Sequence, residues 1–361
     1  MVNISLCMIV KNEEKNIENC LKSIEKIIDE IIIIDTGSTD STKKIAAEYT
    51  NLIYDFKWSD DFSMARNYSF SKATKDYIMW LDADDIITNE NQKLFKELKE
   101  NLDNETDIVM CKYNTAFDEE GHPTFFYYRE RIIRRSLNLK WKGAIHEAIT
   151  PTGKIIYSDF AVNHNKTQTQ YSKRNLKIFE KLILSGKILE PREQFYYARE
   201  LYYHEEYKKS IDILSRFLDS NKGWIENNLE ACKILSYCFY KINDENSALR
   251  ALIRSFEYDE PRAETCCDIA KHFLDRDLIN QSIFWYKTAL SCSKKEKTGA
   301  FTRQDCYNFL PFIQLSVCYD KLKDMSAANY YNEMAGKYRP KNQAYLRNKE
   351  YFRKFIHNSG L

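Results

Sequence analysis

Short apolar runs alternate with amphipathic stretches along roughly the first 165 residues. The apolar runs predict strands at residues 4–10, 31–34, 52–54 and 77–81. The stretches between them predict helices at residues 16–28, 39–49 and 63–72. Continuous apolar strands separated by helices are typical of a parallel sheet that is covered on both faces. We therefore expect a doubly wound, mostly parallel α/β domain over residues 1–168.

The pattern changes near residue 170, and from Tyr171 onward it is helical throughout. Small residues recur inside this pattern 38, 34 and 45 residues apart, at Ser210, Ala248, Ser282 and Ala327. A period near 34 residues is that of tetratricopeptide helix pairs, which stack into a solenoid with a concave binding face. We expect an all-α, tetratricopeptide-like repeat domain over residues 169–361. A helical bundle that supports the first domain is the alternative.

Composition and charge exclude several classes of function. Lys and Arg total 54 against 53 Asp and Glu, which indicates a mixed surface and argues against a nucleic-acid partner. The apolar runs are far shorter than the ~20 residues that span a bilayer, and no apolar signal segment opens the sequence. We therefore expect a cytoplasmic protein. Ten cysteines without a C-x-x-C pair predict reduced, mostly buried thiols.

The nine glycines do not have the spacing of either common phosphate-binding loop, G-x-G-x-x-G or G-x-x-x-x-G-K-[ST]. A cluster of acids, Asp82, Asp84 and Asp85, instead follows the strand predicted at 77–81. Carboxylates in an Asp-x-Asp arrangement suit Mg²⁺ or Mn²⁺, which bridges protein and substrate phosphates. Ligands of doubly wound sheets gather beyond the carboxyl ends of the strands. The cluster therefore predicts a cation site, with a solvated turn as the alternative.

Four segments of the chain carry a recognisable order of motifs. They are Ser-Leu-Cys-Met-Ile-Val-Lys-Asn-Glu-Glu at 5–14, Asp-Thr-Gly-Ser-Thr-Asp at 35–40, Ala-Arg-Asn at 65–67 and Asp-Ala-Asp-Asp at 82–85. In this order they resemble the family 2 glycosyltransferases of the GT-A fold. The helical tail is similar to that of bacterial members with tetratricopeptide-like repeats, among them the sublancin-type peptide S-glycosyltransferases. The resemblance implies a metal-dependent, inverting transferase that uses a nucleotide-sugar, usually a UDP-sugar.

The resemblance also implies which residues bind the donor. Those placed against the nucleoside are Val10, Asn12, Glu13 and Asp35. Thr36 stands where many relatives have a second acid. Arg66 matches a family position near the nucleotide, where a guanidinium can pair with phosphate, and a surface helix arginine is the alternative. Asp82 is expected near the ribose and Asp84 on the metal, Mn²⁺ or Mg²⁺.

An inverting transferase needs one group that accepts the proton of the acceptor. Many relatives present it in a Glu-Asp pair, whereas this chain has Trp-Lys-Gly-Ala-Ile-His-Glu at 141–147, which looks like the motif of the repeat-bearing members. We expect Glu147 to be the base. His146 is the second candidate, or a group that positions the acceptor. His164 is expected on the metal, because several GT-A enzymes supply a late histidine; a hydrogen-bonded core histidine is the alternative.

Three functions are compatible with this organisation. The first is transfer of a sugar to a peptide or protein acceptor that the repeats guide. The second is transfer to a polysaccharide or lipid-linked acceptor, with the repeats forming a homodimer. The third is a non-catalytic tetratricopeptide scaffold, against which the intact Asp-x-Asp and the His-Glu pair argue. The sugar, the nucleotide and the acceptor atom (O, N or S) stay open.

Overall fold

The computed structural model describes residues 1–165 and 172–359. Contacts within the chain divide it into two units, of which the first comprises Met1–Glu200 and Lys297–Ala300 and the second the remaining residues. The boundary expected between residues 168 and 169 lies outside the described residues. Helix α5 (Arg174–Leu184) and most of α6 (Pro191–Tyr203) belong to the first unit.

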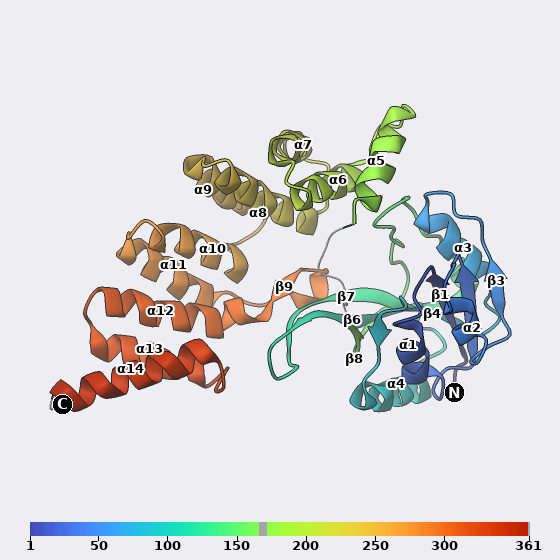
Figure 1. Cartoon of the computed structure of the whole chain (residues 1–361), viewed down its shortest axis with the longest axis horizontal. Helices are drawn as coiled ribbons and strands as arrows, with labels where there is room; N and C mark the ends of the chain where they lie inside the picture. The colour runs from blue at the N-terminus through green and yellow to red at the C-terminus, as the bar shows by residue number, and fades with distance from the viewer. Residues whose placement is uncertain (166–171, 360–361) are drawn as a thin grey trace. The chain divides into compact units, whose positions relative to one another are not determined.

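The first unit is built on a mixed sheet, with the strand order β3-β2-β1-β4-β7-β6-β8-β5 (Figure 1). Its strands are β1 (Ile4–Val10), β2 (Glu30–Asp35), β3 (Ile53–Asp55), β4 (Tyr77–Trp80), β5 (Asp85–Ile86), β6 (Ile108–Phe117), β7 (Pro123–Arg134) and β8 (Ile155–His164). Strands β1 to β4 pair in parallel, whereas β7 runs antiparallel to both β4 and β6. The expected α/β class is confirmed.

Helices cover both faces of this sheet, as continuous apolar strands require. They are α1 (Ile17–Ile24), α2 (Thr42–Ala46), α3 (Phe62–Lys72) and α4 (Asn89–Asn101), with the 3₁₀ turn η1 at Arg135–Leu137. Leu6 on β1 belongs to the same buried cluster as Leu21 of α1 and Phe95 of α4. Its neighbour Cys7 points to the other face, into the cluster that contains Phe70 of α3. Successive residues of one strand therefore fill two separate cores.

The second unit is a row of helices joined by short turns (Figure 1). Its elements are α7 (Tyr207–Asp219), α8 (Ile225–Lys241), α9 (Glu245–Arg254), η2 (Ser255–Glu257), α10 (Ala263–Leu274), α11 (Ile279–Ser291), β9 (Thr302–Arg303), η4 (Gln304–Tyr307), α12 (Phe309–Lys321), α13 (Met325–Gly336) and α14 (Gln343–Ser359). The 3₁₀ turn η3 (Glu296–Thr298) is divided between the two units, with Lys297 and Thr298 in the first. Consecutive helices pack as the pairs α8/α9, α10/α11 and α12/α13. The expected helical repeat fold is confirmed, except that Thr302–Arg303 form a two-residue strand in the segment expected to be helical throughout.

The turn between α6 and α7 and the turns inside the three helix pairs share one backbone feature. A residue with positive φ occupies the equivalent point of each turn, at Glu205, Asn243, Asp277 and Lys323. The fifth residue after each is small and fully buried, and these residues are Ser210, Ala248, Ser282 and Ala328. The prediction of Ala327 was therefore wrong by one position, because Ala327 is only half-buried. Helical spacing alone does not distinguish two adjacent alanines, whereas the turn geometry does.

Two further expectations concern the whole chain. All ten cysteines lie within the described residues; they are free thiols, and nine of them are buried. Along the part of the chain that the structure describes, no helix combines the length and the apolar character needed to cross a bilayer.

Candidate active site

The carboxyl ends of β1 and β2 lie side by side and carry residues that were predicted to bind the nucleotide-sugar. Val10 is paired with Asp35 in the register of the two strands. The buried Asp35 accepts hydrogen bonds at Oδ2 from the backbone N–H groups of Gly37 and Ser38, at 3.1 and 3.0 Å. Its Oδ1 is buried and has no partner among the described residues. A buried carboxylate oxygen that accepts no hydrogen bond is costly in a folded protein. The Oδ1 atom therefore marks a place where an N–H or O–H group of a ligand could bind.

The loop after β1 is tied to the loop after β2. Asn12, which has a φ of +55°, accepts a hydrogen bond at Oδ1 from the backbone of Thr39 (2.8 Å) and donates its own N–H to Ser38 Oγ (3.0 Å). The backbone N–H of Glu13 donates to Thr42 Oγ1 at 2.7 Å. These bonds hold Asn12 and Glu13 at the same edge of the sheet as Asp35.

Asp85 is the structural member of the acid cluster. Its side chain is fully buried in an ion pair with the equally buried Arg131, at 3.1 Å. Its Oδ1 accepts a hydrogen bond from the hydroxyl of Tyr113 (2.9 Å), and its Oδ2 accepts one from the backbone N–H of Asp82 (3.0 Å). The charge of Asp85 is thus compensated inside the protein, and both of its carboxylate oxygens already accept hydrogen bonds. The roles of Tyr113 and Arg131 were missed, since isolated residues of two later strands carry no motif.

Asp84 and His164 form the accessible part of the same cluster. Strand β5 pairs with β8 so that His164 lies opposite Asp85, and this pairing brings His164 Nδ1 to 3.5 Å from Asp84 Oδ1. Ligand atoms of Asp84, Asp85 and His164 all lie within 4.8 Å of one another. Burial raises the pKa of Asp84 to about 6, with the charges of Asp82 and Asp85 acting in the same direction against that of His164. A bound cation would relieve this repulsion.

The donor set of this group fits the cation that the motif predicts. Carboxylate oxygen suits both Mg²⁺ and Mn²⁺, and imidazole nitrogen suits Mn²⁺ better. Since Asp85 is occupied by Arg131, Asp84 and His164 are the side chains that could hold the ion. Their side chains are 28% and 23% exposed, so the ion could also reach a substrate phosphate.

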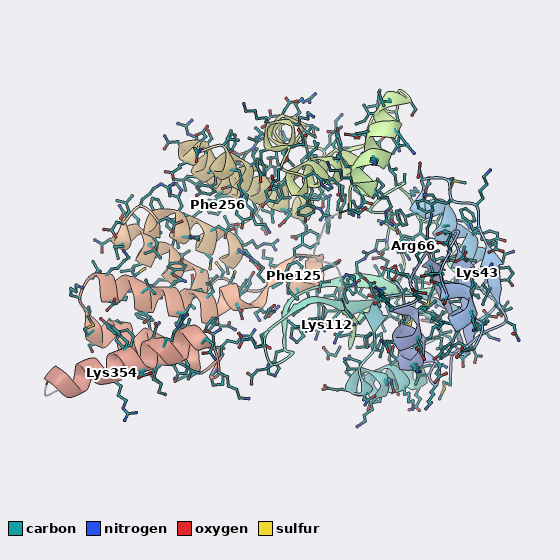
Figure 2. All side chains as sticks on the ribbon, viewed as in Figure 1. Lys43, Arg66, Lys112, Phe125, Phe256 and Lys354 are labelled. Atoms are coloured by element: carbon teal, nitrogen blue, oxygen red, sulfur yellow. The ribbon has the colours of Figure 1, made fainter. Side chains whose placement is uncertain are left out.

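Arg66, which is labelled in Figure 2, connects the acid motif to the predicted base. Its Nη2 donates to Asp82 Oδ1 at 2.8 Å and its Nε to Glu147 Oε1 at 2.5 Å. The guanidinium carbon also lies 4.8 Å from the centroid of the Trp80 ring and 4.9 Å from that of the Trp141 ring. Arg66 is therefore a buried residue, and the alternative of a surface helix arginine is wrong. Although burial acts to raise the pKa of Asp82, the Arg66 and Arg131 charges hold it below its usual value.

The loop that carries Glu147 is fastened to helix α3. Asn67 and Trp141 exchange two hydrogen bonds, from Trp141 N to Asn67 Oδ1 (2.9 Å) and from Asn67 Nδ2 to Trp141 O (3.0 Å). The backbone N–H of Phe62 donates to Ala144 O at 2.9 Å. Sequence reasoning gave Asn67 no role, although it belongs to the Ala-Arg-Asn motif. Adjacent residues of one motif thus hold the loop (Asn67) and its carboxylate (Arg66).

His146 lies next to Glu147 but faces helix α6. Its Nε2 is 2.9 Å from Glu200 Oε1, its Nδ1 is 3.4 Å from Arg199 Nη2, and its ring stacks on Tyr196 at 4.2 Å. Burial lowers the pKa of His146 to about 4, and the Arg199 charge adds to this, so the imidazole is neutral near pH 7. The two predicted catalytic residues are thus neighbours in the sequence, but their side chains contact different partners: His146 contacts helix α6, and Glu147 contacts Arg66.

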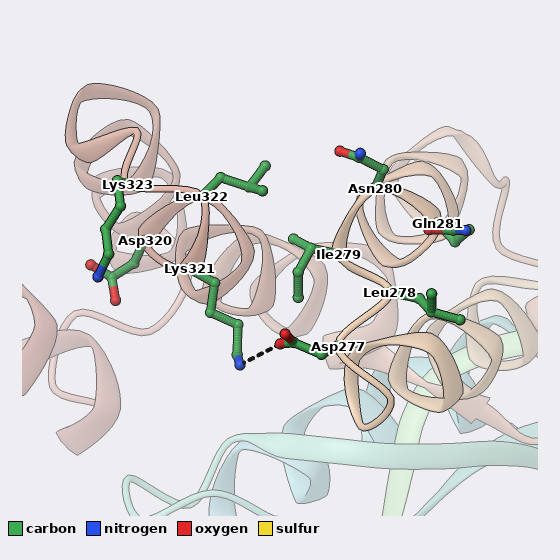
Figure 3. Close-up of a pocket in the computed structure, with 9 residues that line it drawn as sticks. All are labelled: Asp277, Leu278, Ile279, Asn280, Gln281, Asp320, Lys321, Leu322 and Lys323. Atoms are coloured by element: carbon green, nitrogen blue, oxygen red, sulfur yellow. Dashed lines mark hydrogen bonds and ion pairs between the residues drawn. The ribbon is translucent and has the colours of Figure 1, made fainter.

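A hollow of about 580 Å³ occurs within the second unit (Figure 3). It is lined by residues 277–281 and 320–323, which form the turns of two helix pairs. Lys321 and Asp277 form an ion pair there at 2.9 Å. The hollow contains neither a histidine nor a thiol, and it lacks the chemistry of the site at the sheet edge.

A doubly wound sheet with an Asp-x-Asp site beyond its central strands defines a GT-A type domain. The family model described as Glycosyl transferase family 2 matches residues 5–160. This part of the chain is a family 2 glycosyltransferase domain, and the resemblance drawn from its four motifs is confirmed.

Curated relatives and a solved structure extend the comparison. A TPR repeat-containing protein of Synechococcus elongatus is 34% identical over 151 residues, which cover 41% of this chain and 36% of that protein. The SPbeta prophage-derived glycosyltransferase SunS of Bacillus subtilis is 28% identical over 280 residues, covering 74% and 64%. The chain thus spans less than two thirds of either relative. The crystal structure of S. aureus TarS matches 68% of this chain and 54% of that chain, at 16% identity and a TM-score of 0.39.

Proposed function

We propose that the chain is a metal-dependent, inverting glycosyltransferase that transfers a sugar from a nucleotide-sugar, a UDP-sugar, to a peptide or protein acceptor. The observation that carries the proposal is the contact of Arg66 with both Asp82 and Glu147. This contact joins the donor motif to a carboxylate on a separate loop. A donor site and a proton acceptor in one place are what an inverting transfer requires.

Val10, Asn12, Glu13 and Asp35 bind the nucleoside in this proposal. Support comes from their common position at the ends of β1 and β2 and from the unpartnered Oδ1 of Asp35, which could accept a base N–H. Asp82 lies toward the ribose. Arg66 contributes positive charge on the side of the diphosphate.

Asp84 and His164 would hold Mn²⁺ or Mg²⁺. When bound, the cation would supply positive charge that compensates the diphosphate leaving group. The chain's own contribution is the arrangement around that position. Arg131 and Tyr113 occupy Asp85, so that Asp84 is the acid of the cluster left to face a ligand.

Glu147 is the general base of the proposed reaction. Its Oε1 accepts the hydrogen bond of Arg66 Nε, and Oε2 would accept the proton of the acceptor. A hydroxyl acceptor would depend strongly on this base, whereas a thiol is already partly ionised near neutrality. The dependence of the rate on Glu147 therefore also reports the acceptor atom.

The proposed peptide or protein acceptor would bind along the helical repeats. The similarity to SunS supports this, since the 280 matched residues must reach beyond the sheet domain into the helical region. Stacked helix pairs present a long concave surface suited to an extended chain.

The test is a thermal-shift series with the full chain, using UDP-glucose, UDP-N-acetylglucosamine and UDP, each with and without Mn²⁺. A ligand at 100 times its dissociation constant stabilises the folded state by ~2.7 kcal/mol. We expect a shift for at least one UDP compound that requires Mn²⁺. A flat response to all three, with and without the cation, would overturn the proposed donor chemistry and favour a scaffold.

A further inference from the structure

The residue next to the proposed base has a backbone conformation that is uncommon for residues other than glycine. His146 has a φ of +50°, in the left-handed region that is disfavoured for residues other than glycine. Three residues earlier, Gly143 has a φ of +99°. The segment between them is closed by two backbone hydrogen bonds of 3.0 Å between Lys142 and Ala148. A strained conformation of this kind persists only where the surroundings hold it in place.

Helix α6 provides these surroundings. The imidazole of His146 lies flat on the ring of Tyr196, with 4.2 Å between centroids and 17° between planes. Glu200 Oε1 accepts a hydrogen bond from His146 Nε2 (2.9 Å) and another from Asn175 Nδ2 (3.1 Å). The guanidinium of Arg192 donates to the backbone carbonyl of His146, at 3.2 Å from Nη2. The ring and the carbonyl of one residue are thus both held by the same helix.

The hydrogen-bond partners also fix the protonation of the imidazole. Arg199 can only donate, so His146 Nδ1 accepts, and the carboxylate of Glu200 accepts, so Nε2 carries the proton. Both ring nitrogens are therefore engaged on the side of α6. Neither of them is available to take a proton from an acceptor bound near Glu147.

We propose that His146 is a positioning residue, which Glu200 and Tyr196 of helix α6 hold in the left-handed conformation so that the following Glu147 faces Arg66. This inference rests on the proposed role of Glu147 as the base. The turn at His146 reverses the direction of successive side chains, one toward α6 and the next toward the acid motif. Helix α6, which carries no residue of the motifs, thereby acts on the reacting centre from outside it.

The first experiment measures the loop without any substrate. Hydrogen exchange of the amides in residues 142–148 is compared in the wild type, Glu200→Ala, Glu200→Gln and the control Glu180→Ala, an exposed residue of α5. We expect Glu200→Ala to accelerate exchange about tenfold, because the loop loses the acceptor that fixes His146. Glu200→Gln keeps an acceptor oxygen and should restore most of the protection. Equal exchange in all four proteins would overturn the proposal.

The second experiment separates positioning from proton transfer. Hydrolysis of UDP-glucose with Mn²⁺ is followed against pH in the wild type, Glu147→Gln and His146→Asn, since asparagine tolerates the left-handed conformation better than most residues. We expect His146→Asn to lower kcat about tenfold with an unchanged KM. The acidic limb of the pH–rate profile, which is the fall in rate as the base becomes protonated, should stay unchanged. An acidic limb lost in His146→Asn and kept in Glu147→Gln would make His146 the base and overturn the proposal. A wild type that does not hydrolyse UDP-glucose counts against the proposed donor alone, because the exchange experiment still decides whether α6 holds the loop.

Discussion

Arg66 and Glu147 are 81 positions apart in the sequence and are joined by a hydrogen bond of 2.5 Å between Nε and Oε1. Neither side chain is more than 10% exposed. The same guanidinium bonds Asp82, whose side chain is 35% exposed, so three charged groups from three separate segments meet at the buried Arg66. Removing the Arg66 guanidinium would leave Asp82 and Glu147 without their positively charged partner. Such a loss is far more costly than the loss of a surface ion pair.

Replacing Arg66 should therefore destabilise the fold as well as the site. We expect Arg66→Met to lower the free energy of unfolding by about 3–5 kcal/mol. Arg66→Lys keeps the charge but cannot bond both carboxylates in the same planar geometry, so an intermediate loss is expected. The measurement is urea unfolding at neutral pH. Arg216→Met, which breaks an exposed ion pair with Asp212, is the control and should cost less than about 1 kcal/mol.

Glu147→Gln should leave the fold intact and reduce transfer. Loss of a general base lowers turnover by roughly 10²–10⁴-fold. The donor should bind as before, because its proposed contacts lie at Asp35 and Asp84. Steady-state rates with a UDP-sugar, together with thermal shifts, measure the two effects separately. Glu97→Gln changes an exposed acid of α4 and should match the wild type; an equal rate for Glu147→Gln would remove this residue from the mechanism.

Asp84→Asn should abolish the response to the cation. If Mn²⁺ at 100 times its dissociation constant stabilises the wild type by ~2.7 kcal/mol, we expect less than about 1 kcal/mol in the variant. Thermal unfolding with increasing Mn²⁺ measures this. Glu120→Gln is a demanding control, because Glu120 belongs to a second acidic group with a histidine, on the turn between β6 and β7. If Glu120→Gln lost the Mn²⁺ response and Asp84→Asn kept it, the cation would bind at the turn between β6 and β7.

The depressed pKa of His146 predicts a loss of stability in acid. The unfolded chain takes up this proton near pH 6.5, whereas the folded protein takes it up only near pH 4, so unfolding becomes easier as pH falls between these values. The charged groups near the ring are Glu200, Arg199 and Arg192, beside the stacked Tyr196, and protonation of Glu200 acts in the same direction. We expect the difference in unfolding free energy between pH 7 and pH 4 to be about 3 kcal/mol smaller in His146→Asn. Identical pH profiles would contradict the burial of a neutral imidazole.

The register of the helix pairs can be tested with two adjacent alanines. Ala328 is fully buried, whereas Ala327 is half-buried. We expect Ala328→Leu to destabilise the protein by about 1–3 kcal/mol, because added methylene groups find no space in a packed interface. Ala327→Leu should cost less than 1 kcal/mol in the same denaturation experiment. The opposite order would restore the register read from the sequence.

The sequence was sufficient where local pattern determines structure. The strand predicted at residues 4–10 is β1 at its exact bounds, and the acids at 82–85 follow β4 as expected. It was insufficient where distant segments meet. The pairing of β5 with β8 places His164 opposite Asp85, 79 positions earlier in the sequence, and the two strands carry no common motif. The contact of α6 with His146 is of the same kind, since helical periodicity does not tell which loop a helix covers.

The repeated turn geometry has a consequence for how such a chain can change in length. Asn243 and Asp277 occupy equivalent points of successive turns, each five residues before a buried small residue. A deletion that joins residue 242 to Asp277 would remove helices α9 and α10, which together make one repeat length, and would let α8 and α11 form a pair around an equivalent turn. Recombination at this point can therefore shorten or lengthen the array in whole repeats, while the sheet domain and its acid motif keep their own sequence.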